Sequence, residues 1–199
     1  MSSSRTLPNI LISGTPATGK TTLCETLLSL AQSSTPPLRL QHLSINDIIK
    51  SDPSFHSTPS KTNANEDHAL TVDDDNLDLL MDSVSGTISD GNAGGFVLDW
   101  HSTSGFAVRW IDLVVVLTCP DTSVLYDRLS ARGYSEEKVQ ENMDAEIFGI
   151  VSEEARESWE EGQVVELKSE KAEDVEENAE RILAWIGNWI RNREGKEEG

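Results

Sequence analysis

The chain has 199 residues, enough for one α/β domain with a full hydrophobic core but short for two independent domains. Sixteen Lys and Arg residues against thirty-five Asp and Glu residues give a formal net charge of −19, which disfavours broad contact with nucleic-acid phosphates. The two cysteines, Cys24 and Cys119, are too few and too far apart for a disulfide framework or a zinc cluster, so we expect reduced, buried thiols.

No segment has the character of a membrane anchor. Residues 1–8 contain no apolar stretch of the signal-peptide kind, and no apolar run approaches the roughly 20 residues that span a bilayer. We therefore expect a soluble, intracellular protein that makes no membrane contact. Because the chain also lacks a compact Lys/Arg-rich run, its composition does not separate cytoplasm from nucleus.

Strand-like and helix-like patterns alternate along the chain. A polar stretch at 51–65, rich in Ser, Thr and Pro, is expected to form a loop or lid. In chain order the predicted elements are strand 9–13, helix 20–32, strand 38–43, helix 45–50, helix 72–85, strand 96–99, strand 113–117, helices 123–132, 135–149 and 152–160, strand 164–167 and helix 173–192.

This alternation predicts the fold class. The run at 113–117 consists entirely of Leu and Val, the pattern of a parallel strand that is buried on both faces. Strands that alternate with helices favour a parallel sheet with helices on both sides. We therefore predict an α/β fold with a doubly wound parallel sheet of about five strands, in a single domain over 1–199.

Two segments of unusual composition are predicted to be structural. The last predicted helix carries a stripe of Ile and Trp at helical spacing, which indicates core packing and not a membrane surface. The charged tail 193–199 is expected to be disordered. The acidic run at 73–76 lacks the Gly and Glu of a calcium loop, so it is interpreted as the start of a helix.

The strongest chemical motif is the segment 14–21, Gly-Thr-Pro-Ala-Thr-Gly-Lys-Thr, between a predicted strand and a predicted helix. It matches the pattern of a phosphate-binding loop, whose successive backbone amides at a helix N-terminus meet phosphate oxygens. Gly19 lets the backbone approach, Lys20 neutralises charge on the terminal phosphates, and the Thr21 hydroxyl is a ligand for Mg²⁺. The motif predicts a site for ATP and Mg²⁺.

Asp99 ends the predicted strand 96–99, where an open α/β sheet presents side chains to its ligand crevice. We predict that it supplies the second Mg²⁺ contact, and the alternative is a carboxylate that caps a turn. His101 lies two residues on, on the same side if the strand conformation continues, and is a candidate to orient a water molecule. A structural or exposed role for His101 remains equally open.

Arg132 precedes Gly133 and Tyr134 after a predicted helix. A guanidinium near the phosphates would stabilise charge on the transferred group, whereas spacing alone favours a helix C-terminal arginine before a glycine cap. The sequence does not rank the other candidates, which are Arg109, Arg128 and Arg156.

The order and wording of the motifs resemble one family over nearly the whole chain, the adenylate kinase isoenzyme 6 family, also described as coilin-interacting nuclear ATPases. The resemblance rests on the phosphate loop 14–22, Val-Leu-Asp-Trp-His at 97–101, Arg-Gly-Tyr at 132–134, and Glu-Asn at 141–142 followed by Glu-Ile-Phe at 146–148. Arg-Trp at 109–110 and the pair Trp185 and Trp189 match as well.

The resemblance implies a P-loop kinase fold with a short lid, dependence on ATP and Mg²⁺, and both adenylate kinase and ATPase activity. It further implies a role in small (40S) ribosomal subunit biogenesis and 18S rRNA precursor maturation, with a basic platform ribosomal protein of the pre-40S particle as partner. Nucleus and cytoplasm are the implied locations, and we expect a monomer. The acidic charge suits a basic protein partner and predicts weak binding to naked RNA.

Carried over residue by residue, the resemblance implies an ATP-binding segment at about 14–22, a monophosphate-binding region at about 44–69 and a lid at about 131–141. Lys20, Asp99, His101 and Arg132 are then the implied catalytic residues, and Thr21 and Asp99 the implied metal ligands. The implied nucleotide-binding residues are Gly14, Ala17, Thr18, Gly19, Lys20, Thr21, Thr22, Arg132 and Lys171.

Three departures separate this chain from the family pattern. Ala17 replaces a Gly, Asn46 and Lys50 replace a Gly and an Arg in the monophosphate region, and 52–69 lacks the family's tyrosines. The residues implied to bind ATP therefore match the family pattern better than those implied to bind AMP. Transfer to AMP, and ATP hydrolysis that switches the binding of a ribosomal protein, both remain open, as does a small-molecule kinase without a ribosomal role.

Overall fold

The computed structural model describes residues 5–55, 74–90 and 93–197. Its centre is a five-stranded sheet in which every neighbouring pair is parallel, in the order β2-β3-β1-β4-β5. The strands are β1 (Ile10–Gly14), β2 (Gln41–Ser44), β3 (Phe96–Asp99), β4 (Leu113–Thr118) and β5 (Val164–Lys168). The predicted α/β fold and the predicted strand count are confirmed.

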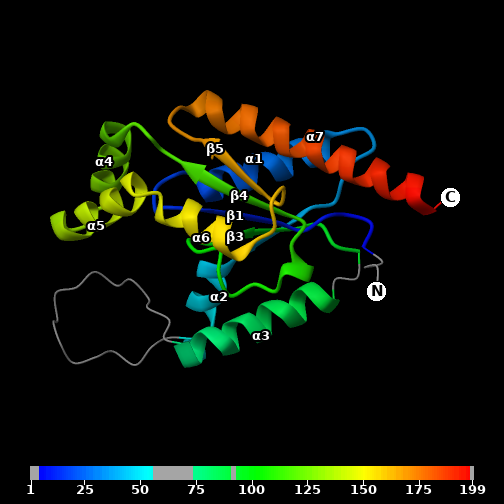
Figure 1. Ribbon diagram of the computed structural model, residues 1–199, viewed down its shortest axis with the longest axis horizontal. Coiled ribbons are helices and arrows are strands. Elements are labelled where there is room, and N and C mark those ends of the chain that lie inside the picture. Colours follow the sequence, from blue (N-terminus) through cyan, green and yellow to red (C-terminus); the bar gives the residue numbers. More distant parts are fainter. Residues whose placement is uncertain (1–4, 56–73, 91–92, 198–199) are drawn as a thin grey trace.

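Helices cover both faces of this sheet (Figure 1). In the picture α1 and α7 lie on one face, α2, α3 and α6 on the other, and α4 and α5 beyond the carboxyl ends of the strands. The helices are α1 (Lys20–Ser33), α2 (Ile45–Ser51), α3 (Asp74–Asp90), α4 (Thr122–Ala131), α5 (Glu136–Ile147), α6 (Ile150–Ser158) and α7 (Ala172–Glu197), with 3-10 turns at Pro53–Phe55 and Val108–Trp110.

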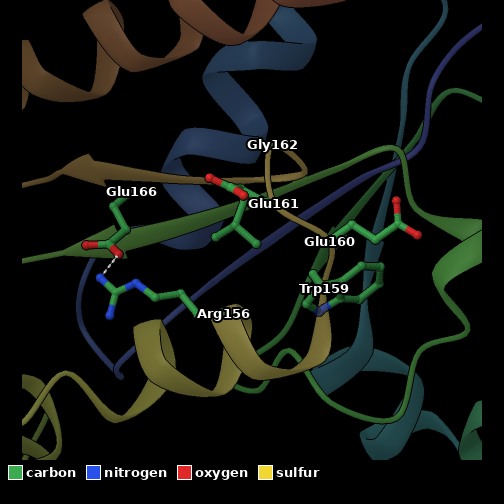
Figure 2. Close-up of a pocket in the computed structure, with 7 residues that line it drawn as sticks. Arg156, Trp159, Glu160, Glu161, Gly162 and Glu166 are labelled. Atoms are coloured by element: carbon green, nitrogen blue, oxygen red, sulfur yellow. Dashed lines mark hydrogen bonds and ion pairs between the residues drawn. The ribbon is translucent and has the colours of Figure 1, made fainter.

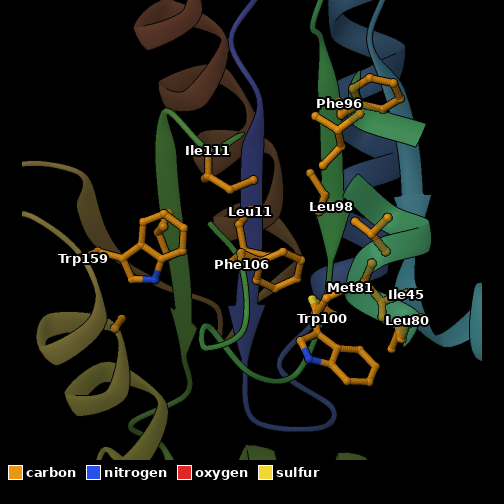
Figure 3. Close-up of a cluster of buried hydrophobic side chains, with 14 of the residues drawn as sticks. Leu11, Ile45, Leu80, Met81, Phe96, Leu98, Trp100, Phe106, Ile111 and Trp159 are labelled. Atoms are coloured by element: carbon orange, nitrogen blue, oxygen red, sulfur yellow. The ribbon is translucent and has the colours of Figure 1, made fainter. Parts of the chain in front are cut away.

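Alternate residues of the central strands face opposite helix layers, as the two-residue period of a strand requires. In β1, Leu11 joins the apolar cluster under α2, α3 and α6 (Figure 3), whereas Ile10 and Ile12 join the cluster under α1 and α7. Both sets are buried, because helices cover each face of a parallel sheet. The face of the sheet on which a strand residue lies therefore determines which helices its side chain can contact.

The segment before β2 differs from its prediction. Residues 38–40 are outside the strand, because the Leu38 N–H donates to Ala31 O and so closes the turn that follows α1. The strand starts only at Gln41, whose N–H donates to Gly95 O beside β3. Most of the predicted lid at 51–65 and of the monophosphate-binding region 44–69 lies outside the described residues.

The chain end also differs from its prediction. Helix α7 continues to Glu197, so residues 193–197 of the tail that we expected to be disordered are helical, and 198–199 lie outside the described residues. The Arg193 guanidinium stacks 4.8 Å from the Trp189 ring centroid, which gives this last turn a packing partner. Within the described ranges, no helix combines the length and apolar character needed to cross a membrane.

Candidate nucleotide-binding site

The predicted site residues gather where β1, β3 and β4 end. Strand β1 lies between β3 and β4, at the point where the chain changes direction across the sheet. In open α/β sheets this point leaves a crevice outside the carboxyl ends of the strands. The segment 14–19 runs from β1 through that crevice into the N-terminus of α1.

Two glycines give the phosphate loop its shape. Gly14 has φ 142° and Gly19 has φ 95°, both in the region that favours glycine. A Cβ at Gly14 would lie 2.5 Å from Leu117 O on β4, so no other residue fits there without movement. Within the loop, Thr18 Oγ1 donates to Thr15 O at 2.8 Å. The result is a tight turn that leads into the amino end of α1, the arrangement in which backbone N–H groups hold a phosphate.

Ala17 also has a positive φ, of 70°, although it is not a glycine. An L-residue in this conformation costs about 1 kcal/mol. Its methyl group is buried in an apolar cluster under α4 and α5, hereafter the α4/α5 cluster, made of Ala17, Cys119, Leu125, Leu129 and Val139. Burial of that methyl group offsets the conformational cost, and the loop keeps its form.

The Lys20 side chain lies across the loop. Its Nζ donates to Gly14 O at 2.7 Å and to Thr15 O at 3.0 Å. Burial lowers the pKa of Lys20 to about 8, and the charge of Arg132 acts in the same direction, while the charge of Asp99 opposes both. When a phosphate binds, the Lys20 ammonium would exchange its two neutral carbonyl partners for anionic oxygens. This exchange favours the charged form of Lys20 over the neutral amine.

Thr21 and Asp99 form a direct pair. The Thr21 hydroxyl donates to Asp99 Oδ2 at 2.6 Å, and Asp99 is level with Ile12 of β1 in the sheet. Burial alone would raise the pKa of Asp99, but the adjacent His42 imidazole, the Thr21 hydrogen bond and the Lys20 charge outweigh it and lower that pKa. A hydroxyl and a carboxylate side by side at the start of α1 are hard oxygen ligands of the kind that Mg²⁺ prefers, so these residues fit that ion.

His101 does not continue the strand. Strand β3 ends at Asp99, the Trp100 N–H still donates to Ile12 O, and the chain then bends at His101. The imidazole packs against the Trp100 ring with centroids 4.0 Å apart. The residue is exposed, but the desolvation of its ring and the Lys20 charge lower the pKa of His101, with Glu154 acting in the opposite direction, so the ring is neutral at pH 7.

The histidine beside Asp99 is His42 of β2, which the sequence analysis did not select. His42 Nε2 lies 3.8 Å from Asp99 Oδ2. In the sheet His42 pairs with Val97, two residues before Asp99, and two residues along a strand return to the same face. The strand order needed to find this neighbour is not visible in the sequence.

A second residue missed by sequence reasoning is Glu154 of α6. Its Oε1 accepts hydrogen bonds from Ser102 Oγ at 2.5 Å, from Thr103 N at 3.0 Å and from Ser104 N at 2.6 Å. These bonds hold the segment that follows His101 against α6. Burial would raise the pKa of Glu154, but the same hydrogen bonds lower it, and the carboxylate is charged at neutral pH.

Arg132 is both a helix C-terminal arginine and a cation near the phosphate loop, the two roles considered from the sequence. It caps α4 ahead of Gly133, whose φ of 78° fits a glycine C-cap. Its guanidinium is exposed, and its charge acts on the pKa of Lys20, so it is within electrostatic reach of the phosphate loop.

The other arginine candidates have partners within the protein. Arg128 donates to Ser169 O and Glu170 O, Arg109 stacks on Trp110, and Arg156 contacts Glu153 and Glu166. Arg128 thus lies beside the connection after β5, whose Ser169 approaches Gly19, whereas Arg132 is the arginine of this set whose charge acts on Lys20.

The remaining predicted nucleotide-binding residues lie at the rim. Thr22 is exposed in the first turn of α1. Lys171 is exposed in the connection between β5 and α7, where its N–H donates to Asp174 Oδ2. The same connection approaches the phosphate loop, because a Cβ at Gly19 would lie 3.3 Å from Ser169 Oγ. Both residues are thus on the border of the loop.

A separate pocket of about 390 Å³ lies at α6 and β5 (Figure 2). It is lined by the Trp159 ring, by three glutamates and by Arg156, which is in ion-pair contact with Glu166. None of its lining residues belongs to the phosphate loop or to the pair Thr21 and Asp99. This pocket is therefore separate from the phosphate loop.

Comparison with known proteins agrees with this geometry. A family model described as an AAA domain matches residues 10–149. The chain is 42% identical over 189 residues to a protein named adenylate kinase isoenzyme 6 homolog from Schizosaccharomyces pombe, covering 94% of this chain and 97% of that protein. A protein of the same name from Caenorhabditis elegans is 40% identical, covering 93% and 92%.

Solved structures show the same fold at low identity. A shikimate kinase from Bacteroides thetaiotaomicron superposes with a TM-score of 0.54 at 15% identity, covering 91% of this chain and 99% of that one. A gluconokinase from Sinorhizobium meliloti gives 0.52 at 13% identity, covering 96% and 98%. The fold is that of P-loop kinases, and the identities to the two homologs show that the chain belongs to the adenylate kinase isoenzyme 6 family of nucleotide kinases.

Proposed function

We propose that this nucleotide kinase uses ATP and Mg²⁺ to transfer the terminal phosphoryl group to AMP or to water. The observation that carries the proposal is the direct pair between Thr21 and Asp99 at the start of α1, with the Lys20 ammonium across the adjoining loop. These groups meet at the strand ends, beside the helix N-terminus that favours anions.

Each residue then has a defined task. The loop amides and Lys20 bind the phosphates, while Thr21 and Asp99 would hold Mg²⁺, which supplies charge neutralisation at the phosphates when bound. Arg132, at the start of the proposed lid 131–141, approaches the transferred group. The neutral His101 orients the attacking water, and Lys171 borders the base.

Whether AMP or water accepts the phosphoryl group depends on the residues of the monophosphate-binding region. Asn46 and Lys50 occupy the monophosphate region, and Lys50 Nζ lies 3.7 Å from Asp47 Oδ1 on the exposed surface of α2. A single ammonium replaces the bidentate fork that an arginine offers to a phosphate. We therefore propose that hydrolysis is favoured over transfer to AMP, and the alternative is a small-molecule kinase with another acceptor.

We further propose that the protein acts in 40S subunit biogenesis, in the nucleus and the cytoplasm, as a monomer that binds a basic platform ribosomal protein of the pre-40S particle. Support comes from the family membership and from the net charge of −19. Opposite charge speeds encounter with a basic protein, whereas it repels the backbone of naked RNA.

An exposed apolar patch is a candidate contact for that partner. Ile147, Phe148 and Ile150, at the turn between α5 and α6, are 59%, 75% and 54% exposed. The second half of helix α5, which ends at this turn, carries the exposed Glu141 and Asp144. Apolar anchors with carboxylates around them suit a basic protein surface, because the charges attract the partner and the apolar groups bind it.

One assay tests the catalytic proposal. ATP hydrolysis and ATP-plus-AMP turnover are measured side by side, with and without a basic platform ribosomal protein. Hydrolysis that the ribosomal protein stimulates, with weak transfer to AMP, supports the proposal. Fast phosphorylation of AMP at a rate that the ribosomal protein does not change would make the protein a metabolic adenylate kinase. The absence of both AMP phosphorylation and ATP hydrolysis would favour the small-molecule alternative.

A second assay tests the partner surface. Association with the ribosomal protein should slow as salt rises and the Debye length falls from about 30 Å at 0.01 M to 10 Å at 0.1 M. Phe148→Ser should weaken that complex, while Tyr126→Ser, which changes another exposed aromatic residue, on α4, should not. Binding of the ribosomal protein that does not change with salt concentration, together with tight binding of naked precursor rRNA, would contradict the proposal.

A further inference from the structure

Three side chains that ligate metals meet on the α1 face of the sheet. They are Cys24 of α1, His42 of β2 and Asp99 of β3, and one ligand atom from each lies within 4.8 Å of the other two. Cys24 is three residues after Thr21, close to one helical turn, and Thr21 is bonded to Asp99. The cluster is thus assembled from three separate elements and adjoins the phosphate loop.

This ligand set differs chemically from the oxygen pair proposed for Mg²⁺. A thiolate, an imidazole and a carboxylate together are the set that Zn²⁺ and similar thiophilic cations prefer, whereas Mg²⁺ takes oxygen ligands. The sequence analysis discounted a zinc cluster because the chain has only two cysteines far apart. A mixed site needs only one of them, and the fold supplies the other two ligands.

One of the three groups has no hydrogen-bond partner, and a second is a buried thiol. His42 Nε2 is shielded from solvent and has no hydrogen-bond partner, at 3.8 Å from Asp99 Oδ2. Cys24 is fully buried, and burial raises the pKa of its thiol. A divalent cation would give the imidazole nitrogen a partner and deprotonate the thiol.

The spacing is close to what a tetrahedral ion needs. Bonds of about 2.0–2.3 Å put the ligand atoms of a zinc site roughly 3.3–3.8 Å apart. His42 Nε2 and Asp99 Oδ2, at 3.8 Å, are within about 0.5 Å of the spacing for nitrogen and oxygen ligands, and the wider limit of 4.8 Å asks for about 1 Å of side-chain movement at Cys24.

We infer that Cys24, His42 and Asp99 form a binding site for a thiophilic divalent cation such as Zn²⁺, and that its occupancy inhibits the enzyme. Inhibition follows because Asp99 is shared: once it ligates this ion, it is unavailable to Thr21 and to Mg²⁺. The binding part of the inference stands on the cluster alone, whereas the inhibitory part rests on the proposed function.

Co²⁺ spectroscopy on the full chain tests binding. Co²⁺ reports thiolate ligation by its near-ultraviolet charge-transfer absorption, which Zn²⁺ should abolish by displacement. Cys24→Ala should lose this absorption and Cys119→Ala should keep it, because Cys119 is a buried thiol outside the cluster. The absence of the band in the wild type, or its persistence in Cys24→Ala, would overturn the site.

The second variant guards against a folding artefact. His42→Gln changes a half-buried strand residue and should weaken Co²⁺ binding at least about tenfold, with the melting temperature of each variant measured in parallel. If Cys24→Ala fails to fold, unchanged Co²⁺ affinity in a folded His42→Gln protein overturns the inference.

Turnover assays test inhibition separately. With Mg²⁺ in excess, Zn²⁺ should inhibit the wild type and Cys119→Ala at a concentration at least about tenfold lower than Cys24→Ala requires, and a chelator should restore activity. Equal sensitivity of all three proteins overturns the inhibitory role. A wild type that shows the Co²⁺ band but turns over no nucleotide keeps the site and refutes the proposed function.

Discussion

The phosphate loop and the segment that follows β3 line the same edge of the sheet but are held in different ways. Residues 14–21 are shaped by their own sequence, through the glycines at 14 and 19 and the bond from Thr18 to Thr15. Residues 101–105 depend on Glu154 and on the Trp159 indole, which donates to Thr103 O, both about fifty residues away. A local motif builds one side of the site and tertiary contacts build the other.

The largest expected effect comes from the local side. Lys20→Ala should lower ATP turnover by a factor of about 10³ or more, because it removes the charge held against the terminal phosphates. The fold should persist, since a buried ammonium is lost and not an apolar contact. Arg191→Ala, which removes a cation from the far part of α7, is the control. Wild-type turnover by folded Lys20→Ala protein would refute the phosphate-loop assignment.

His101 tests the tertiary side of the site. His101→Gly should lower kcat for ATP hydrolysis by about 10²-fold and leave the ATP dissociation constant nearly unchanged, because a neutral imidazole that orients water acts in the reaction and not in binding. Stopped-assay kinetics and calorimetry separate the two quantities. A parallel loss of affinity would assign His101 a structural role.

Glu154 tests how the tertiary side is held. Glu154→Ala should lower the free energy of unfolding by about 1–3 kcal/mol at neutral pH, because three donors lose a charged acceptor, and Glu157→Ala on the exposed side of α6 should lower it far less. Denaturant unfolding measures both variants.

The same variant carries a pH dependence. The folded-state pKa of Glu154 is lowered, so its contribution is fully present above the unfolded value of about 4.3 and is lost as pH falls through the folded value. The stability difference between wild type and Glu154→Ala should therefore shrink at acid pH. A difference that is constant from pH 7 to pH 3 would show that the carboxylate charge is not what holds the segment.

The smallest expected effect is at Ala17. Ala17→Gly relieves a positive φ that costs about 1 kcal/mol but loses a buried methyl group worth about 0.8 kcal/mol, and glycine also adds freedom to the unfolded chain. The free energy of unfolding and the ATP affinity should both stay close to wild type. A gain above about 1.5 kcal/mol would show that the α4/α5 cluster does not offset the strain.

The sequence by itself determined the strand that leads into the phosphate loop, the loop, and the helix that follows. It could do so because the two glycines and the Thr18–Thr15 bond that turn the loop lie within eight consecutive residues, and because the pattern of glycines followed by lysine and threonine is specific to phosphate loops. The central strands were equally readable, since burial on both faces leaves continuous apolar runs. Asp99 was found for the same local reason, at the end of such a run.

The tertiary structure alone decided which groups surround Asp99. The order β2-β3-β1 places His42 next to it, and the α1 helix delivers Cys24 to the same face, neither of which can be derived without strand order. The bend after β3 carries His101 away from the line of the strand, and its fixing by Glu154 is a contact across some fifty residues. Such contacts leave no periodic pattern in the sequence, because they form only when elements far apart in the chain pack against each other.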